Sequence, residues 1–222
     1  MNDFLKHKNS QKRVFLENEV YFITNNTFNN YPYFKEEILC DLWIKELNLC
    51  KNLKKFELYA FCLNYNHFHL LFKPSEEFDV SEILRSFKTN YSRNVNRIIE
   101  NENYTLPQAK LDDLAFLQAR SRDLAYKESD NLTYKKLYNL TYLEKYNKFL
   151  QNLKNQFQKK HKNESFPKFQ WQKSFHDHII RNQDDFEKHW NYTTYNFQKH
   201  NMPSDWEYTS LNFLKIIDNF QH

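Results

Sequence analysis

The sequence predicts an α+β fold, and two observations indicate it. Short runs of β-branched and aromatic residues lie between turn-forming asparagines, whereas longer segments carry apolar residues at helical spacing. The chain has 222 residues, of which 40% are hydrophobic. This is enough for one domain with a buried core and a substantial insertion.

Three strands are expected in the first part of the chain. Residues 19–25, EVYFITN, combine β-branched and aromatic side chains and so are typical of a strand. Residues 56–63 and 67–73 predict two further strands, the second of which ends before Pro74. Because only residues 64–66 separate these two strands, we expect them to form a hairpin.

Helices are predicted where apolar residues recur every three to four positions. This spacing occurs at residues 34–49, 79–100 and 184–200. Asp79 is of a residue type that caps helix N-termini. Tyr91 falls within the apolar stripe of the second helix, so we expect it in the core.

The composition changes between residues 101 and 166, where Asn, Lys, Gln, Leu and Tyr dominate. We interpret this segment as a helical insertion, with helical runs near 111–127 and 132–160. The expected organisation is therefore residues 1–100 and 167–222 as two parts of one domain, with 101–166 inserted between them.

The absence of glycine excludes several phosphate-binding sites. The sequence contains no glycine, and both the P-loop and the dinucleotide fingerprint need it where the backbone approaches phosphate. The asparagine pairs at 25–26 and 29–30 are then expected to supply left-handed turns. Cys40, Cys50 and Cys62 show no CxxC spacing, which favours buried thiols in a reducing cytosol.

No signal peptide or membrane span is expected, because no run of about twenty apolar residues occurs. The net charge is +4. Lys and Arg recur in stretches rich in Tyr, Phe and Asn, a mixture suited to phosphates and stacked bases. We therefore expect a cytoplasmic, nucleoid-associated protein that does not bind membranes.

The strand at 67–73 carries two histidines that flank a phenylalanine. Side chains two apart on a strand point to the same face, so His67 and His69 can share one cation while Phe68 is buried opposite. Packed or surface histidines are the alternative. A second pair, His176 and His178, has the charged Asp177 between them where a core residue would be needed, so the first pair ranks higher.

The helix at 184–200 supplies partners for this pair. A polar row beside its apolar stripe includes Tyr192 and Asn196, one turn apart. Tyr192 is the candidate nucleophile, and Asn196 offers a carbonyl oxygen as the third metal ligand after His67 and His69. Since no cysteine accompanies them, Mg²⁺ or Mn²⁺ is favoured over structural zinc. A solvated helix flank is the alternative interpretation.

Basic residues supply candidate DNA contacts. On the helix at 79–100 the basic side chains lie largely opposite the apolar stripe, and a further arginine precedes the helix at 184–200. The candidates for binding phosphates are Arg85, Lys88, Arg93, Arg97 and Arg181. A solvated charged face is the alternative.

Together these motifs resemble a known family. The strand NHFHLLF, the helix VSEILRSFKTNYSRNVNR, the segment WQKSFHDHIIRN, a helix with Tyr192 and Asn196, and a closing DWEYTS are similar to the single-tyrosine HUH transposases. The order of the motifs is most similar to that of the REP-associated tyrosine transposases. The resemblance covers roughly residues 15–100 and 168–212.

The resemblance implies an α+β fold of the HUH endonuclease, ferredoxin-like type, with a central antiparallel sheet packed on helices and the histidine strand near its middle. In that family the histidine pair and a further polar ligand hold a divalent metal. A helix tyrosine attacks single-stranded DNA and leaves a 5′-phosphotyrosine link. His67, His69, Tyr192 and Asn196 match these positions. His189 and the dipeptide at 181–182 match other recurring positions.

The sequence also departs from the family pattern. Asn64-Tyr65-Asn66 stands where the family commonly has Met-Pro-Asn, and Phe197 stands where a proline follows the asparagine. The insertion at 101–166 is longer than expected. These departures concern the entry into the histidine strand and the specificity for substrate.

The function expected from this resemblance is DNA transposition by cleavage of single-stranded or hairpin DNA. The expected partners are that DNA and a second copy of the chain in a homodimer. Three alternatives stay open. They are a domesticated nuclease that processes repeat hairpins, a nucleic-acid-binding protein with packed histidines and an inert Tyr192, and a metal phosphoesterase that activates water.

Overall fold

The computed structural model describes residues 16–100, 132–162 and 164–220, with the backbone alone between 132 and 143. The chain divides into two compact units. The first combines Met1–Tyr91 with Gln170–His222, and the second is Ser92–Phe169. The helical run expected near 111–127 lies outside the described residues.

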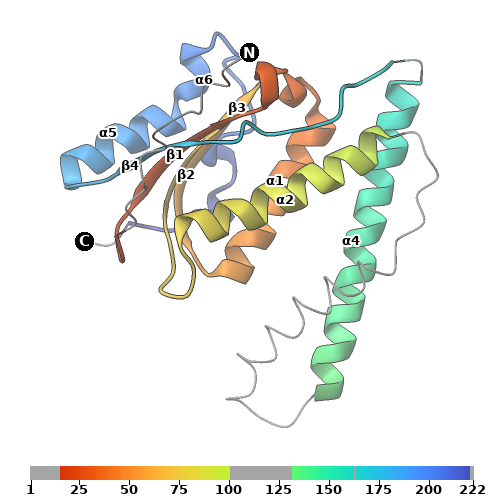
Figure 1. The fold of residues 1–222 in the computed structure, drawn as a ribbon, viewed down its shortest axis with the longest axis horizontal. Coiled ribbons are helices and arrows are strands. Elements are labelled where there is room, and N and C mark those ends of the chain that lie inside the picture. Colours follow the sequence, from red (N-terminus) through yellow and green to blue (C-terminus); the bar gives the residue numbers. More distant parts are fainter. Residues whose placement is uncertain (1–15, 101–131, 163, 221–222) are drawn as a thin grey trace, which may run out of the picture. The chain divides into compact units, whose positions relative to one another are not determined.

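The first unit is built on a four-stranded antiparallel sheet (Figure 1). Its strands are β1 (Tyr21–Asn26), β2 (Glu57–Asn64), β3 (His67–Lys73) and β4 (His176–Ile179), in the order β2-β3-β1-β4. The α+β fold, the hairpin of β2 and β3 and the interior place of the histidine strand are therefore confirmed.

Helices α1 (Glu37–Lys54) and α2 (Val80–Ile99) supply aromatic side chains to the core on one face of the sheet. Phe68 of β3 packs against Trp43 with ring centroids 5.5 Å apart, and against Phe87 at 5.9 Å. Because side chains alternate along a strand, Phe68 points to this face while His67 and His69 point to the other. Phe68 is fully buried, as expected for the residue between the two histidines.

The expected caps and core positions of α2 are confirmed. The side chain of Asp79 accepts a hydrogen bond from the backbone N–H of Glu82 at 2.7 Å, and the Glu82 carboxylate accepts one from the Asp79 N–H at 3.2 Å. This reciprocal pair is a capping box. Tyr91 is fully buried and its hydroxyl donates to the backbone oxygen of Leu39.

Helix α5 (Gln183–Thr194) packs against β2 and β3 from the other face, and the short α6 (Asn196–Lys199) packs against β2 (Figure 1). The expectation of one continuous helix over 184–200 is wrong, because the helix is interrupted at Tyr195. Two buried β-branched residues, Thr193 and Thr194, precede the interruption, and such side chains lose rotamer freedom in a helix.

The second unit contains α4 (Leu132–Lys160), which confirms the helical run predicted over 132–160. Leu153 and Phe157 are buried on this helix. The imidazole of His161 follows its end, where it packs against Phe157 and bonds to the Glu164 carboxylate at 2.7 Å. Residues 132–160 of the expected insertion are thus helical.

Short 3-10 turns complete the described chain. They are η1 (Phe28–Asn30), η2 (Tyr33–Lys35), η3 (Ser210–Asn212) and η4 (Leu214–Ile216). Asn29 and Asn30 have positive φ angles, as expected in a chain without glycine. The same expectation for residues 25–26 is wrong, because they lie at the end of β1, where the backbone is extended.

The expectation of buried thiols is confirmed. The three cysteines are buried and form no disulfide. Burial raises the pKa of Cys50 and of Cys62 to about 12, so both thiols are protonated. Among the described residues, every helix is too short or too polar to cross a lipid bilayer.

Candidate active site

The two histidines of β3 face α5 and α6. In the sheet, His67 pairs with Asn26 and His69 with Thr24 of β1. Both side chains are buried, with 7% and 3% of their surface exposed, and their ring centroids are 4.9 Å apart. The two-residue period of a strand therefore brings the two imidazoles together on one face.

Hydrogen bonds at Nδ1 orient both imidazoles. Nδ1 of His67 lies 2.7 Å from the side-chain oxygen of Asn66, which can only accept. His67 therefore carries its proton on Nδ1 and presents a lone pair at Nε2. Nδ1 of His69 lies 2.7 Å from the Thr24 hydroxyl, and its buried Nε2 makes no hydrogen bond within the described residues.

Burial keeps both imidazoles neutral. Desolvation lowers the pKa of His67 to about 4, with a further lowering by His200 and a smaller opposing effect of the Asn196 side chain. Desolvation, followed by the nearby His67, lowers the pKa of His69 to about 3. At neutral pH both rings are thus in the form that binds metal ions.

Asn196 lies beside the histidine pair. It is fully buried, and its side-chain oxygen accepts a hydrogen bond from Nδ2 of Asn64 at 2.8 Å. The same Nδ2 lies 3.0 Å from Nε2 of His67. The Asn64 amide group therefore lies between two of the three ligands predicted from the sequence.

A third histidine joins the pair, and the sequence analysis missed it. The rings of His200 and His67 have centroids 4.7 Å apart, and one nitrogen each of His67, His69 and His200 lie within 4.8 Å of one another. We call these three residues the histidine cluster. His200 follows Asn196 by one helical turn, a spacing that could have indicated it.

Several side-chain nitrogen and oxygen atoms that can bind a cation thus lie close together. They are Nε2 of His67, Nε2 of His69, the side-chain oxygen of Asn196 and a ring nitrogen of His200. Nε2 of His69 is buried and unpaired within the described residues, and such an atom beside other nitrogen and oxygen ligands favours a bound cation. The residues present therefore fit a divalent metal ion.

Tyr192 of α5 lies next to this cluster. Its ring centroid is 5.3 Å from that of His69 and 5.6 Å from that of Phe22. The ammonium group of Lys199 lies 4.1 Å from the centroid of the same ring. Tyr192 is 37% exposed, so the residue is partly open to solvent.

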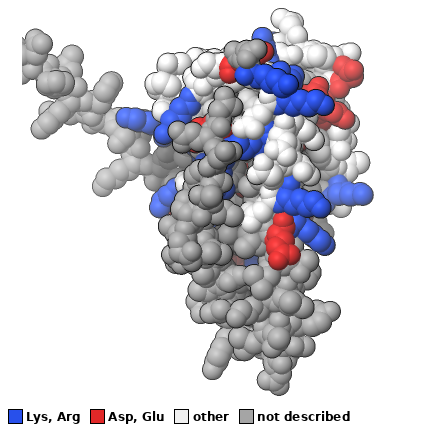
Figure 2. Space-filling model, turned by 90° about the vertical axis from the view of Figure 1, so that its right-hand side faces the viewer, with Lys and Arg blue, Asp and Glu red and all other residues white. Residues whose placement is uncertain are grey.

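The basic residues predicted to bind DNA differ in exposure. Arg85 and Arg181 are exposed, whereas the other three are half-buried. The ammonium group of Lys88 donates to the backbone oxygen of Gln172, and the guanidinium group of Arg97 donates to Asn94. On the face drawn in Figure 2, Lys and Arg gather at several places and Asp and Glu at fewer.

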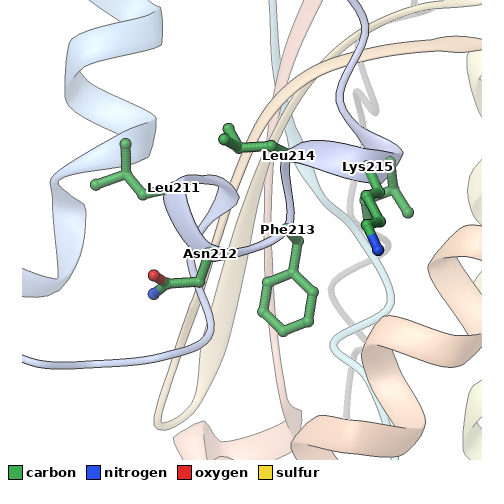
Figure 3. A pocket seen from close by; sticks show the side chains of 6 residues that line it. Leu211, Asn212, Phe213, Leu214 and Lys215 are labelled. Atoms are coloured by element: carbon green, nitrogen blue, oxygen red, sulfur yellow. The ribbon is translucent and has the colours of Figure 1, made fainter.

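A surface pocket lies in the C-terminal segment, away from these residues in the sequence. It is lined by residues 211–216, including Leu211, Phe213 and Leu214 (Figure 3). None of the residues predicted for catalysis, metal binding or DNA binding lines it. The pocket therefore adds nothing to the candidate site.

Comparison with known families places this geometry in context. Residues 20–110 match the IS200-like transposase family. The chain is similar to the IS200-like transposases. The matched segment includes β1, the histidine strand and α2, and the resemblance noted from the sequence is confirmed.

Two solved structures are similar to the chain. A REP-associated tyrosine transposase, solved bound to a REP hairpin, has 16% sequence identity and a TM-score of 0.52, and the match covers 93% of this chain and 84% of that one. It confirms the fold. A presumed transposase from Deinococcus radiodurans has 12% identity and a TM-score of 0.34, over 50% of this chain and 97% of that one. No curated protein matches the chain in sequence.

Proposed function

We propose that this chain is a metal-dependent transposase that cleaves and rejoins single-stranded DNA at or near hairpins through Tyr192. The observation that carries the proposal is the position of the Tyr192 ring, 5.3 Å from that of His69 at the edge of the histidine cluster. The similarity to IS200-like transposases supports the same reaction class.

The ligands for the ion would be His67, His69 and Asn196, with His200 as a further donor. A divalent ion held there would polarise a non-bridging oxygen of the scissile phosphate. The neutral state of His67 and His69 at pH 7 suits this role, since both rings offer lone pairs.

Tyr192 would carry the covalent step. Its phenolic oxygen attacks phosphorus and loses its proton to water, while the bond from phosphorus to the 3′ oxygen breaks and that oxygen takes up a proton. The products are a 5′-phosphotyrosine and a free 3′-hydroxyl. The reverse attack by another 3′-hydroxyl rejoins DNA without an external energy source, because one phosphodiester replaces another.

Lys199 and the exposed arginines would hold the DNA. The ammonium group of Lys199 lies beside the Tyr192 ring, where it can bind a phosphate oxygen of the approaching strand. Arg85 and Arg181 are exposed and would bind backbone phosphates further away. The similar structure was solved with a REP hairpin, which supports hairpin DNA as the ligand class.

The test is formation of a covalent adduct with labelled single-stranded hairpin DNA from the genomic flanks of the gene. With Mn²⁺ or Mg²⁺, the protein should give an adduct that survives denaturation. Tyr192→Phe should abolish it. Tyr195→Phe is the matched control, since Tyr195 is a near neighbour and is 39% exposed, close to the 37% of Tyr192.

Each outcome assigns a function. Cleavage without an adduct would indicate a phosphoesterase that activates water, and hairpin binding without cleavage would indicate a binding protein. An adduct that survives Tyr192→Phe would place the nucleophile on another residue. Matching terminal hairpins on both sides of the gene would support a mobile element, and hairpins dispersed over the genome a domesticated nuclease.

A further inference from the structure

A second cluster of metal-binding side chains lies where β4 meets α5. It consists of His178 on β4 and of Asp185 and His189 on α5, and we call it the β4–α5 cluster. The Asp185 carboxylate lies 2.8 Å from Nε2 of His178 and 3.0 Å from Nδ1 of His189. The two imidazoles stack with ring centroids 4.5 Å apart.

The donor set is that of a transition-metal site. One atom of each of the three side chains lies within 4.8 Å of the others. Two imidazole nitrogens and a carboxylate oxygen are a common ligand set for Zn²⁺, which leaves a fourth position to water. Around Zn²⁺ the ligand atoms are roughly 3.4 Å apart, from ligand distances of about 2.1 Å. The two contacts of the Asp185 carboxylate, at 2.8 Å and 3.0 Å, would therefore lengthen by roughly 0.5 Å when the ion binds.

The cluster is held in place and is accessible. The Asp185 carboxylate accepts a hydrogen bond from the backbone N–H of Arg181, and the Asn182 side chain caps the N–H of Asp185. Burial alone would raise the pKa of Asp185, but the hydrogen bond from His178 and its other partners lower it, so the carboxylate is ionised. The three side chains are between 17% and 36% exposed, which leaves an entry route.

Each imidazole can offer a nitrogen lone pair to an ion at this site. Nδ1 of His189 lies 2.8 Å from the backbone oxygen of Asp185, so the ring donates its proton there in the metal-free state. A shift of that proton to the other ring nitrogen frees the lone pair at Nδ1. The same shift in His178 frees Nε2.

We propose that the β4–α5 cluster binds a second divalent transition-metal ion of the Zn²⁺ class and so fixes the nucleophile helix to the sheet edge. His189 contacts Phe22 with ring centroids 4.9 Å apart, and Phe22 in turn contacts both Tyr192 and His69. The bound ion would therefore restrict the movement of the His189 ring and, through Phe22, that of the Tyr192 ring. Binding of the ion at this cluster does not depend on the proposed function, whereas its effect on Tyr192 rests on that function.

The test is the number of Zn²⁺ ions bound per chain in equilibrium dialysis of the full-length protein. The wild-type chain should bind two ions. The double variant His67→Ala/His69→Ala should bind one, and Asp185→Asn/His178→Gln should also bind one. The matched controls are Asp184→Asn, the neighbouring carboxylate, and His176→Gln, the exposed histidine of the same strand, and both should bind two.

The outcomes separate this inference from the proposed function. If the His67→Ala/His69→Ala variant binds no ion while its circular dichroism stays native, the second site is refuted. If the wild-type chain binds a single ion that only Asp185→Asn/His178→Gln removes, the second site stands and the metal at the histidine cluster fails. A rise in Tm with Zn²⁺ in the His67→Ala/His69→Ala variant should disappear when Asp185→Asn is added.

Discussion

At the scale of single residues, the strand period made the histidine pair predictable. His67 and His69 share a face because side chains alternate along a strand, and Phe68 fills the opposite face. His200 does not lie on this strand, and only its spacing of one helical turn after Asn196 could have indicated it.

His178 shows a second limit of residue-scale reasoning. The charge of Asp177 counted against a metal site, because the residue between two histidines was expected in a core. In the sheet β4 pairs with β1 alone among the described strands, and Asp177 is exposed there. An edge strand tolerates a charged residue in that place, so the argument from Asp177 does not hold.

The pKa values predict a pH-dependent stability of the metal-free protein. The folded-state pKa values of His67 and His69 are about 4 and about 3, below the unfolded value near 6.5. Between these values the unfolded state binds more protons, so the stability present above about pH 6.5 is lost as pH falls. We expect a loss on the order of a few kcal/mol between pH 7 and pH 4.5.

Urea unfolding at the two pH values measures this loss. In His67→Gln/His69→Gln the same drop in pH should reduce the free energy of unfolding much less, because glutamine does not titrate. Equal losses in the variant and in the wild-type chain would show that other groups cause the pH dependence.

At the scale of elements, the periodicity predicted the hairpin and the first two helices within a few residues. The interruption at Tyr195 was not predicted, because the apolar stripe runs on from Phe186 to Phe197, and both of these residues are buried. The interruption separates the tyrosine, on α5, from the buried asparagine at the start of α6. Side-chain spacing alone does not reveal such a change in backbone angles.

The cap of α5 predicts a link between helix stability and cleavage. The side chain of Asn182 accepts a hydrogen bond from the N–H of Asp185 at 2.9 Å. Asn182→Ala should lower the free energy of unfolding by about 1 kcal/mol, and it should also slow adduct formation, since α5 carries Tyr192. Asp79→Ala removes the equivalent cap of α2 and is the control.

The two variants should lose similar stability in urea unfolding, while adduct formation slows in Asn182→Ala alone. A rate that falls equally in both would indicate a general effect of stability. An unchanged rate in Asn182→Ala would mean that the start of α5 does not position Tyr192.

At the scale of the whole molecule, the fold class was predictable but the order of the strands was not. The central pairing of β1 with β3 joins segments that are distant in the sequence, and β4 arrives only after the insertion. Local patterns contain no information on such pairings. The resemblance to a family implied only that the histidine strand lies near the middle of an antiparallel sheet, and the structure confirms this for the described residues.

The charge distribution predicts that DNA binding weakens with salt. Phosphate contacts by Lys and Arg release counterions, and each contact to single-stranded DNA contributes about 0.7 to the slope of log K against log salt. Arg85→Gln and Arg181→Gln should each weaken hairpin binding and reduce this slope by roughly that amount. Fluorescence anisotropy between low and moderate salt measures the slope, and an unchanged slope would remove the arginine from the DNA contact.

The central claim is that Tyr192 becomes linked to the 5′ end of the cleaved strand. The most direct measurement is mass spectrometry of the adduct after digestion of both protein and DNA. We predict that the peptide containing Tyr192 carries a nucleotide 5′-phosphate and that the adjacent Tyr195 is unmodified. A phosphate on any other residue, or on none in a reaction that cleaves the DNA, would contradict the account.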